Sequence, residues 1–354
     1  MSTFVIGFYT ILIAASAGLA YFKQDRWFMM IFSLTLISFI TGIIGGAQAL
    51  RSIAIFVALL AAAAGVSYTF KEFLIRIASP NVAKELRTAP LTAAFGMFVI
   101  FTYAIAGIFA PIIAPFGEAE VISSAFAPAD ANMLLGADQL GRDIFSRIIF
   151  GARNSVGIAL MATMLAFISG ALAGLLAAVK GGWFDQLMGR LADVIMSIPS
   201  LIFSLLMLSI FGTNMTVIVI VVAIIYSPRV FRLTRAVAGN IVVMDYVEAA
   251  KLRGEGDWYL VRREILPNST APLVAEFGLE FCFVFLLIAG LSFLGLGIQP
   301  PTADWGSMVR ENATLISFGD ITPLIPAAAI ALLTVAVNFV VDWMLFRSSG
   351  LKEQ

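Results

Sequence analysis

Eight long stretches of this 354-residue chain contain no charged side chain, and they limit its fold more than any other feature. A helix needs about 20 consecutive apolar residues to cross the hydrocarbon core of a bilayer. The stretches reach or approach that length, and they cover residues 1–22, 27–50, 52–70, 88–117, 154–179, 194–228, 281–303 and 321–341. We therefore predict that all of them cross a membrane.

The stretch at 194–228 is too long for one ordinary span. Near its middle stands the sequence Phe211-Gly212-Thr213-Asn214, which is typical of a turn. Splitting the stretch there gives two helices and a total of nine predicted spans. The predicted fold class is thus all-α, a polytopic membrane protein.

The composition agrees with lipid as the solvent and argues against an enzyme. Hydrophobic residues make up 60% of the chain and charged residues 12%, about half of the roughly 25% that is typical of soluble domains. The net charge of zero gives no sign of a nucleic-acid partner. Histidine, the commonest general base and metal ligand, is absent. The single cysteine, Cys282, lies in an apolar stretch and is interpreted as a packing residue.

No phosphate-binding loop with a Gly-Lys-Ser or Gly-Lys-Thr ending occurs in the sequence. If the chain works with ATP, hydrolysis must therefore belong to another chain. We expect neither a catalytic residue nor a metal ligand here.

The distribution of Lys and Arg predicts which side of the membrane each loop faces. If the N-terminus lies outside, the outer segments hold only five of the 22 basic residues, and the cytoplasmic segments hold the other 17. The five are Arg51, Arg142, Arg147, Arg153 and Arg310. Because cytoplasmic loops are enriched in Lys and Arg, we predict an outer N-terminus and a cytoplasmic C-terminus. The first stretch is not expected to be a cleaved signal peptide, since no basic residue precedes it and Lys23 follows it.

The predicted spans fall into two groups. Three closely spaced helices fill residues 1–70. A charged segment at 71–89, which contains Pro80, follows as a cytoplasmic linker or a helix at the membrane surface. Six further spans occupy 90–346, and 347–354 forms a cytoplasmic tail.

One polar segment inside the second group, at 240–268, has the sequence of a docking site. Its first half favours a short helix, with acidic residues early and basic residues late, as the helix dipole prefers. Gly254 and Gly256 can end that helix with a left-handed turn. We expect a second short helix at 258–265, which Pro267 stops before the next span begins.

The paired alanines Ala249 and Ala250 leave a smooth face on the first helix, where another protein can approach closely. The segment resembles the EAA loop of ABC importer permeases, which inserts into a cleft on the ATPase subunit. The residues that match this loop are Glu248, Ala249, Ala250, Gly254, Leu266 and Pro267. Glu264 departs from the pattern, which often has an aliphatic residue there, and Ile265 supplies the apolar side chain one position later.

Two further motifs narrow the resemblance to the dipeptide and oligopeptide branch of these permeases. The first lies in the outer loop between Leu135 and Arg147, and its motif residues are Gly136, Asp138, Gly141, Arg142 and Asp143. The second is Leu291 to Gly297, followed by Gln299-Pro300-Pro301 and Trp305-Gly306. The resemblance covers about residues 85–346. Ile288 departs from it, because this branch often has a glutamate there.

The resemblance implies a six-helix ABC importer permease core with three extra N-terminal helices, in the cytoplasmic (inner) membrane of a bacterium or archaeon. It implies alternating access for a solute delivered by an extracytoplasmic binding protein. The implied partners are two ABC ATPase subunits, which bind ATP and Mg²⁺, and a second, related permease chain. No cofactor is implied for this chain. Peptides are the default solute of this branch, and nickel, glutathione and oligosaccharides stay open.

Charged residues inside a span are candidates for a solute pathway. Glu276 and Glu280 are four residues apart and therefore lie on one side of the eighth predicted helix. Both lie near the cytoplasmic end of that helix, however, and pairing with basic residues, or simple solvation, is the favoured interpretation. Gly170 and Gly174 form a GxxxG pattern that is typical of close helix packing.

Other interpretations stay open at this point. The arginines Arg142, Arg147 and Arg153 either attract an anionic group or pin the outer loop, and pinning is favoured. A secondary transporter driven by an ion gradient is the alternative function, and ATP dependence in vesicles separates the two. An intramembrane enzyme has no support, because histidine is absent and no carboxylates are paired deep in the bilayer.

Overall fold

The computed structural model describes residues 12, 55 and 58–348. Within this part of the chain every regular element is a helix, and β structure is limited to two isolated bridges. The predicted all-α fold class is confirmed. The chain divides into two compact units, Met1–Arg87 and Thr88–Gln354.

Among the described residues of the first unit, one helix, Ala58–Ile77, is long and apolar enough to cross a membrane. It corresponds to the predicted span at 52–70 and extends into the charged segment that follows. A short helix, α3 (Pro80–Thr88), occupies the rest of that segment. Proline suits the first position of a helix, where its missing N–H has no partner to lose. The predicted spans at 1–22 and 27–50 lie outside the described residues.

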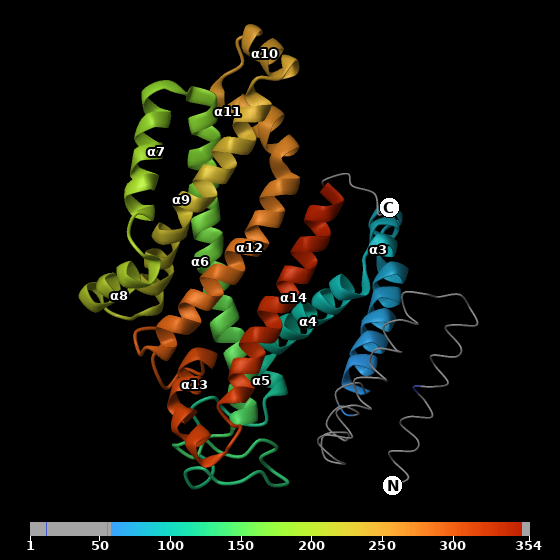
Figure 1. The fold of residues 1–354 in the computed structure, drawn as a ribbon, viewed down its shortest axis with the longest axis vertical. Helices are drawn as coiled ribbons and strands as arrows, with labels where there is room; N and C mark the ends of the chain where they lie inside the picture. Colours follow the sequence, from blue (N-terminus) through green and yellow to red (C-terminus); the bar gives the residue numbers. More distant parts are fainter. Residues whose placement is uncertain (1–11, 13–54, 56–57, 349–354) are drawn as a thin grey trace. The chain divides into compact units, whose positions relative to one another are not determined.

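The second unit is a bundle of long helices joined by short ones (Figure 1). Its helices are α4 (Leu91–Ile108), α5 (Ala110–Ile113), α6 (Ile144–Lys180), α7 (Gly182–Met196), α8 (Ser200–Phe211), α9 (Met215–Val242), α10 (Asp245–Leu252), α11 (Asp257–Tyr259), the π-helix η1 (Leu260–Ile265), α12 (Leu266–Phe293), α13 (Trp305–Asn312), the 3₁₀ helix η2 (Ala313–Phe318) and α14 (Leu324–Ser348). Helix α6 runs along α9, and α12 packs against α6, α9 and α14. The facing sides bury a core that includes Ile158, Val222, Phe285 and Leu333.

Two glycines set the close approach of α6 and α9. A Cβ atom on Gly170 would lie 2.4 Å from the carbonyl oxygen of Ser227, and one on Gly174 would lie 2.8 Å from that of Phe231. Any larger residue would push the helices apart. The predicted packing role of this GxxxG pattern is therefore confirmed.

The predicted turn inside 194–228 is present, but the helix before it is shorter than the span that we predicted there. Gly212 has a φ of +88°, and the side chain of Asn214 accepts a hydrogen bond from Val217 N–H at the start of α9. The helix before the turn, α8, has only 12 residues and cannot cross a bilayer alone. It forms a pair with α7, bent by 86°, which is a broken span or a re-entrant loop. Pro199, directly before α8, explains why the two helices are not continuous.

The second short helix that we expected in the polar segment is not separate from the next span. A single helical stretch runs from Asp257 to Phe293 through α11, η1 and α12. Leu266 N–H donates to the carbonyl of Val261, five residues earlier, which is the hydrogen bond of a π-helix. Pro267 lies inside this stretch, at the start of α12, and does not stop the helix.

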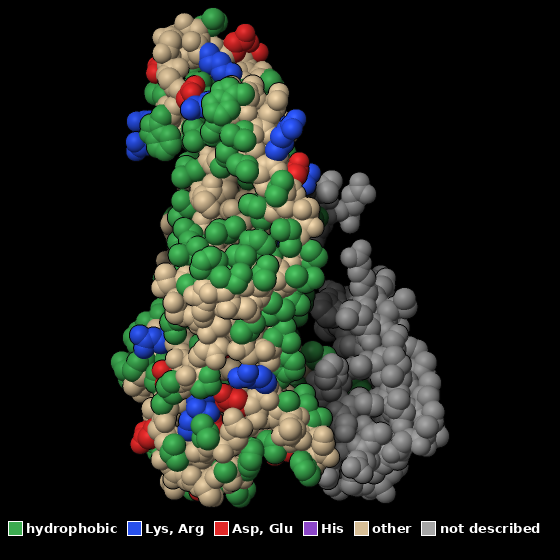
Figure 2. Space-filling view, turned by 90° about the vertical axis from the view of Figure 1, so that its left-hand side faces the viewer, with side chains coloured by type: hydrophobic (Ala, Val, Ile, Leu, Met, Phe, Trp, Pro, Cys, Tyr) green, Lys and Arg blue, Asp and Glu red, His purple; other side chains and the backbone are tan. Residues whose placement is uncertain are grey.

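The surface of the second unit agrees with membrane insertion. On the face that Figure 2 shows, a belt without any Lys, Arg, Asp or Glu separates two ends that carry such side chains. Among the described residues, six helices are long and apolar enough to cross a membrane, or seven if the bent pair counts as one span. The total of nine spans stays a prediction.

Candidate functional site

The polar segment after α9 forms a protrusion, residues 243–267, that we call the α10 knuckle. It lies at one end of the second unit, and α13 lies at the opposite end (Figure 1). Val247 and Ala250 point inward and are fully buried. They belong to a cluster of buried apolar side chains, whose other members are Leu175, Ala238, Ile241, Leu260, Val261 and Ile265. This cluster ties the knuckle to the ends of α6 and α9.

Some of the predicted coupling residues are buried, and the others are exposed. Ala250 and Ile265 are fully buried and belong to the base of the α10 knuckle. The exposed members of the set are Glu248, Ala249, Gly254, Leu266 and Pro267. The smooth face that we expected from two alanines is therefore made by Ala249 alone, because successive residues of a helix face different sides.

Gly254 ends α10 by a Schellman motif. Its N–H donates to the carbonyl of Lys251 at 2.9 Å, and Glu255 N–H donates to that of Ala250 at 3.2 Å. The φ of Gly254 is +83°, whereas that of Gly256 is −77°. The predicted left-handed turn is confirmed for Gly254 and is wrong for Gly256. A Cβ atom at Gly254 would meet nothing within 4 Å, so the backbone angle, rather than space, demands glycine.

Large apolar side chains cover the surface of the α10 knuckle. Leu252 is 84% exposed, Val243 76% and Trp258 59%, and Met244 and Tyr246 are also exposed. Large apolar side chains exposed on a polar protrusion are typical of a site for another protein. Motif matching missed these residues, although the apolar residues within a charged segment were the available signal.

A second built region lies at the other end of the unit. It consists of residues 114–143 and α13, and we call it the α13 lobe. Three of its charged side chains, Arg142, Asp138 and Glu311, are buried together with Arg147 from the first turn of α6. Arg142 Nε lies 2.7 Å from Asp138 Oδ2, and Arg142 Nη2 lies 3.0 Å from Glu311 Oε2. Arg147 Nε lies 3.3 Å from Asp138 Oδ2, and Arg147 Nη2 lies 3.5 Å from Glu311 Oε2.

These pairs give Arg142 and Arg147 a pinning role. Two positive and two negative charges compensate one another, so no excess charge is left to attract an anion. Arg153, in contrast, is exposed and has no part in the cluster. Glu311 is a member that sequence reasoning missed, since it follows Arg142 by 169 positions.

The other three residues of the predicted outer-loop motif, Gly136, Gly141 and Asp143, form turns and a helix cap in the α13 lobe. Gly136 and Gly141 have φ values of +76° and +77°, and a Cβ atom on Gly141 would lie 2.0 Å from the carbonyl oxygen of Ser123. Asp143 caps α6 by accepting a hydrogen bond from Ser146 N–H at 2.7 Å. The five residues of the predicted outer motif thus build the lobe, and three of them belong to its turns and cap.

Helix α13 is fastened to α6 by a buried tryptophan and an aspartate. Trp305 donates from Nε1 to the carbonyl of Ile148 at 3.0 Å, and its indole ring fills the space beside Gly151. Asp304 caps α13 and accepts a hydrogen bond from Ser155 Oγ at 2.8 Å. Burial raises the pKa of the Asp304 carboxyl group.

The two glutamates of α12 differ in their surroundings. Glu280 is 1% exposed, and Arg229 Nε of α9 lies 3.9 Å from its Oε1 atom. Its other oxygen, Oε2, is buried and accepts no hydrogen bond from the described residues. The Arg229 guanidinium stacks over the rings of Tyr226 and Phe283, at 5.4 and 4.9 Å from their centroids. Glu276 is only half-buried.

Within the described part of the chain, no group of three or more His, Cys, Asp or Glu side chains could hold a metal ion. Cys282 is a buried, free thiol beside the Thr334 carbonyl and Asn338.

Known proteins resemble this chain over most of its second unit. The family model described as binding-protein-dependent transport system inner membrane component matches residues 170–348. The di/tripeptide transport system permease protein DppC of Pseudomonas aeruginosa is 35% identical over 254 residues, which are 70% of this chain and 84% of that protein. The dipeptide transport system permease protein DppC of Alkalihalophilus pseudofirmus is 33% identical over 260 residues, covering 73% and 85%. The glutathione transport system permease protein GsiD of Pectobacterium atrosepticum is 34% identical over 258 residues, covering 71% and 84%.

Proposed function

This chain belongs to the family of binding-protein-dependent transport system inner membrane components, and from that membership we propose that it carries short peptides across the membrane. It is the multi-pass permease subunit of an ABC importer in the inner membrane, and separate subunits hydrolyse ATP. A solute-binding protein and an ATPase are its partners by family. The observation that carries the proposal is the exposed α10 knuckle on a permease bundle whose relatives are named for short peptides.

The solute is proposed to be a di- or oligopeptide. The three relatives are named for di/tripeptides, dipeptides and glutathione, and all of these contain peptide linkages.

The α10 knuckle is proposed to dock into the ATPase. Leu252, Trp258 and Val243 supply apolar contact, and Glu248 with Ala249 presents the exposed side of α10. The buried base of the knuckle, with Val247 and Ala250 at its centre, transmits the movement of the ATPase to α6 and α9. A rigid base is required, because a flexible knuckle would absorb the movement instead of passing it to the bundle.

Two ATPase subunits and a second, related permease chain are proposed to complete the transporter. The N-terminus is proposed to lie outside and the C-terminus in the cytoplasm, which puts the α10 knuckle on the cytoplasmic side and the α13 lobe on the outer side. The α13 lobe then faces the binding protein, and its buried ion pairs hold its shape during docking.

Glu280 and Glu276 are proposed to contribute to the solute pathway, together with Arg229. Arg229 is half exposed and Glu280 has an oxygen without a hydrogen-bond partner among the described residues. Charged groups in a span face a bundle interior or water, because lipid does not solvate them. This pair can therefore contact the charged ends of a peptide.

Transport by the reconstituted complex tests the proposal. The permease, its partner chain and the ATPases are placed in proteoliposomes with the binding protein, and uptake of a labelled dipeptide is measured with and without ATP. Uptake that needs both ATP and the binding protein is the expected result. Uptake driven by an ion gradient alone would overturn the importer mechanism, and ATP-driven uptake of only non-peptide solutes would overturn the peptide proposal.

A further inference from the structure

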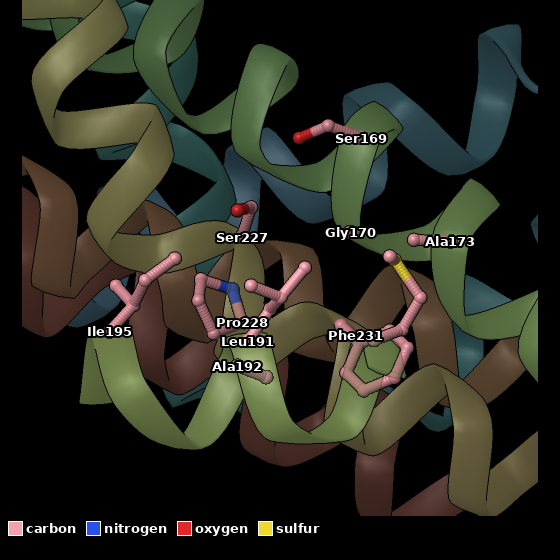
Figure 3. A pocket seen from close by; sticks show the side chains of 10 residues that line it. Ser169, Gly170, Ala173, Leu191, Ala192, Ile195, Ser227, Pro228 and Phe231 are labelled. Atoms are coloured by element: carbon pink, nitrogen blue, oxygen red, sulfur yellow. The ribbon is translucent and has the colours of Figure 1, made fainter. Parts of the chain in front are cut away.

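Two features of the second unit are not used by the roles proposed above. One is an open apolar cavity of about 130 Å³ between α6, α7 and α9 (Figure 3). The two hydroxyl groups in its lining donate within their own helices, Ser169 Oγ to the carbonyl of Leu165 and Ser227 Oγ to that of Ile224. Neither has a hydrogen left to donate to a ligand. The other feature is a strained residue of the α13 lobe, Phe126, and it indicates a partner.

Phe126 has a left-handed backbone. Its φ is +55°, and within the described part of the chain it is the one residue other than glycine with a positive φ. This conformation costs free energy for any residue with a Cβ atom, whereas glycine adopts it readily. The ring does not offset that cost by complete burial, because Phe126 is 47% exposed. Strained residues of this kind are found mostly at functional sites.

The buried ion pairs of the α13 lobe hold Phe126 in this conformation. Phe126 N–H donates to the carbonyl of Asp138 at 2.9 Å. The Asp138 carboxylate is fixed in turn by Arg142 Nε at 2.7 Å and Arg147 Nε at 3.3 Å. The backbone of Phe126 is therefore fixed before any partner arrives.

Phe126 belongs to two antiparallel segments, 121–127 and 137–142. Hydrogen bonds join them, among them that from Ile122 N–H to the carbonyl of Gly141 at 2.9 Å and that from Ala137 N–H to the carbonyl of Ala127 at 2.9 Å. Two further large apolar side chains of these segments, Val121 and Leu140, are exposed. We call Val121, Phe126 and Leu140 the Phe126 group. It lies at the end of the second unit opposite to α10 (Figure 1).

The charges around the Phe126 group are acidic. Residues 111–141 contain no Lys or Arg, and Glu120 and Asp130 are exposed. A lipid surface does not suit this segment, because membrane-bound segments are rich in Lys and Arg and anionic headgroups repel carboxylates. A permanent subunit interface does not suit it either, because such interfaces are large and mostly apolar. A few apolar side chains inside a charged rim are typical of a surface for a partner that binds and leaves.

We propose that Phe126 is the main anchor of this chain for the solute-binding protein, and that its ring enters an apolar pocket bordered by basic side chains. The inference rests on the proposed function, in which the α13 lobe faces that protein. Because the backbone of Phe126 is already fixed, less conformational freedom is lost on association. Aromatic anchors carry much of the binding energy of an interface. The acidic rim mainly steers the encounter, since rim charges affect association rates more than affinity.

Binding of the purified cognate binding protein to the complete transporter in nanodiscs tests this anchor. Phe126→Gly removes the ring and suits the left-handed backbone. We expect the dissociation constant to rise about 30-fold, as for an interface hot spot. The matched control is Phe109→Gly, which removes a phenylalanine that is also 47% exposed but has an ordinary φ of −98°. The control should bind like the wild type. A Phe126→Gly dissociation constant within about threefold of the wild-type value would overturn the proposal.

Photo-cross-linking identifies the protein that covers position 126. The variant Phe126→p-benzoylphenylalanine keeps an aromatic ring, and irradiation should join it to the binding protein. If Phe126→Gly does not assemble, or lowers the melting temperature of the transporter, the cross-link decides alone. Cross-links to the second permease chain or to lipid, with none to the binding protein, would overturn the proposal.

Uptake by the wild-type transporter separates this inference from the proposed function. If labelled dipeptide uptake needs both ATP and the binding protein, but position 126 gives no cross-link to that protein, only the anchor is wrong. If uptake does not need the binding protein at all, the proposed function is wrong and the anchor fails with it.

Discussion

Arg142 donates a hydrogen bond from Nη2 to Glu311 Oε2 across 3.0 Å, although the two residues are 169 positions apart in the chain. The bond joins the loop before α6 to α13, and Arg147 approaches the same oxygen atom at 3.5 Å. The side chains of all three residues are at most 5% exposed. These buried ion pairs therefore hold the loop before α6 against α13. Water cannot easily take the place of either partner.

Removing Glu311 should loosen the α13 lobe. Breaking a buried ion pair typically costs roughly 3–5 kcal/mol, because the remaining charge stays buried without compensation. Glu311→Ala is therefore expected to lower the melting temperature of the assembled transporter and to reduce its response to the binding protein. Differential scanning fluorimetry and binding-protein-stimulated ATP hydrolysis measure the two effects. Glu120→Ala, an exposed carboxylate of the same lobe, is the control, and an equal effect there would contradict the role of the cluster.

Replacing Gly254 should uncouple the ATPase from the bundle. The φ of +83° costs a non-glycine residue roughly 1–2 kcal/mol, and a β-branched residue resists it most. With Gly254→Val, uptake and stimulated ATP hydrolysis should fall together while the chain still inserts. Gly256→Val is the matched control, since its φ of −77° suits valine. Normal uptake by the Gly254 variant would show that the α10 knuckle does not couple transport to ATP.

Glu280→Gln separates a pathway role from a structural one. Glutamine keeps the shape but removes the negative charge beside Arg229. If Glu280 contacts the solute, uptake of a dipeptide with a free amino group should fall several-fold, while uptake of its N-acetylated form should change little. Competition uptake assays with the two peptides measure this. A loss that is equal for both peptides, together with a lower melting temperature, would assign Glu280 to structure alone.

The orientation can be tested with single cysteines in a Cys282→Ser background. Phe318 is 85% exposed on η2, and Asp257 is exposed on the α10 knuckle. An impermeant thiol reagent should label Phe318→Cys in intact cells and Asp257→Cys only after permeabilisation. Asp304 is unsuitable as a probe position because it is fully buried. The reverse labelling pattern would overturn the proposed topology.

The three N-terminal spans are predicted to be accessory. The division of the chain at Arg87 leaves the family match, the α10 knuckle and the α13 lobe in the second unit. A chain that starts near Ser79 should therefore still assemble with its partners and support ATP-driven uptake, at reduced yield. Co-purification and vesicle uptake measure assembly and activity. If a truncated chain is well expressed but does not assemble or transport, the extra helices are required for the function of the transporter.

Several features of the site could be predicted because they depend on local rules. The left-handed turn at Gly254 follows from helix-ending chemistry, and the tight turn at Gly212 follows from its neighbours. Packing of α6 on α9 follows from Gly170 and Gly174, since two small residues one turn apart make a groove whatever the rest of the chain does.

Other features depend on contacts between distant residues and could not be predicted locally. The pairing of Arg142 with Glu311 needs the loop and α13 to meet in space. The burial of Ala250, one residue from the exposed Ala249, depends on where η1 lies beneath α10. The bend between α7 and α8 falls inside the apolar stretch at 194–228, where periodicity does not reveal that a helix breaks.

By itself, the sequence determined the solvent, the helical class and the left-handed turn that ends α10, because hydropathy and glycine chemistry act over short distances. Only the tertiary structure decided which motif residues are exposed and which are buried. It also decided how the buried charges of Arg142, Arg147, Asp138 and Glu311 compensate one another. Those features arise when α6 and α9, or α6 and α13, pack together, and packing depends on shapes and distances that no single segment contains.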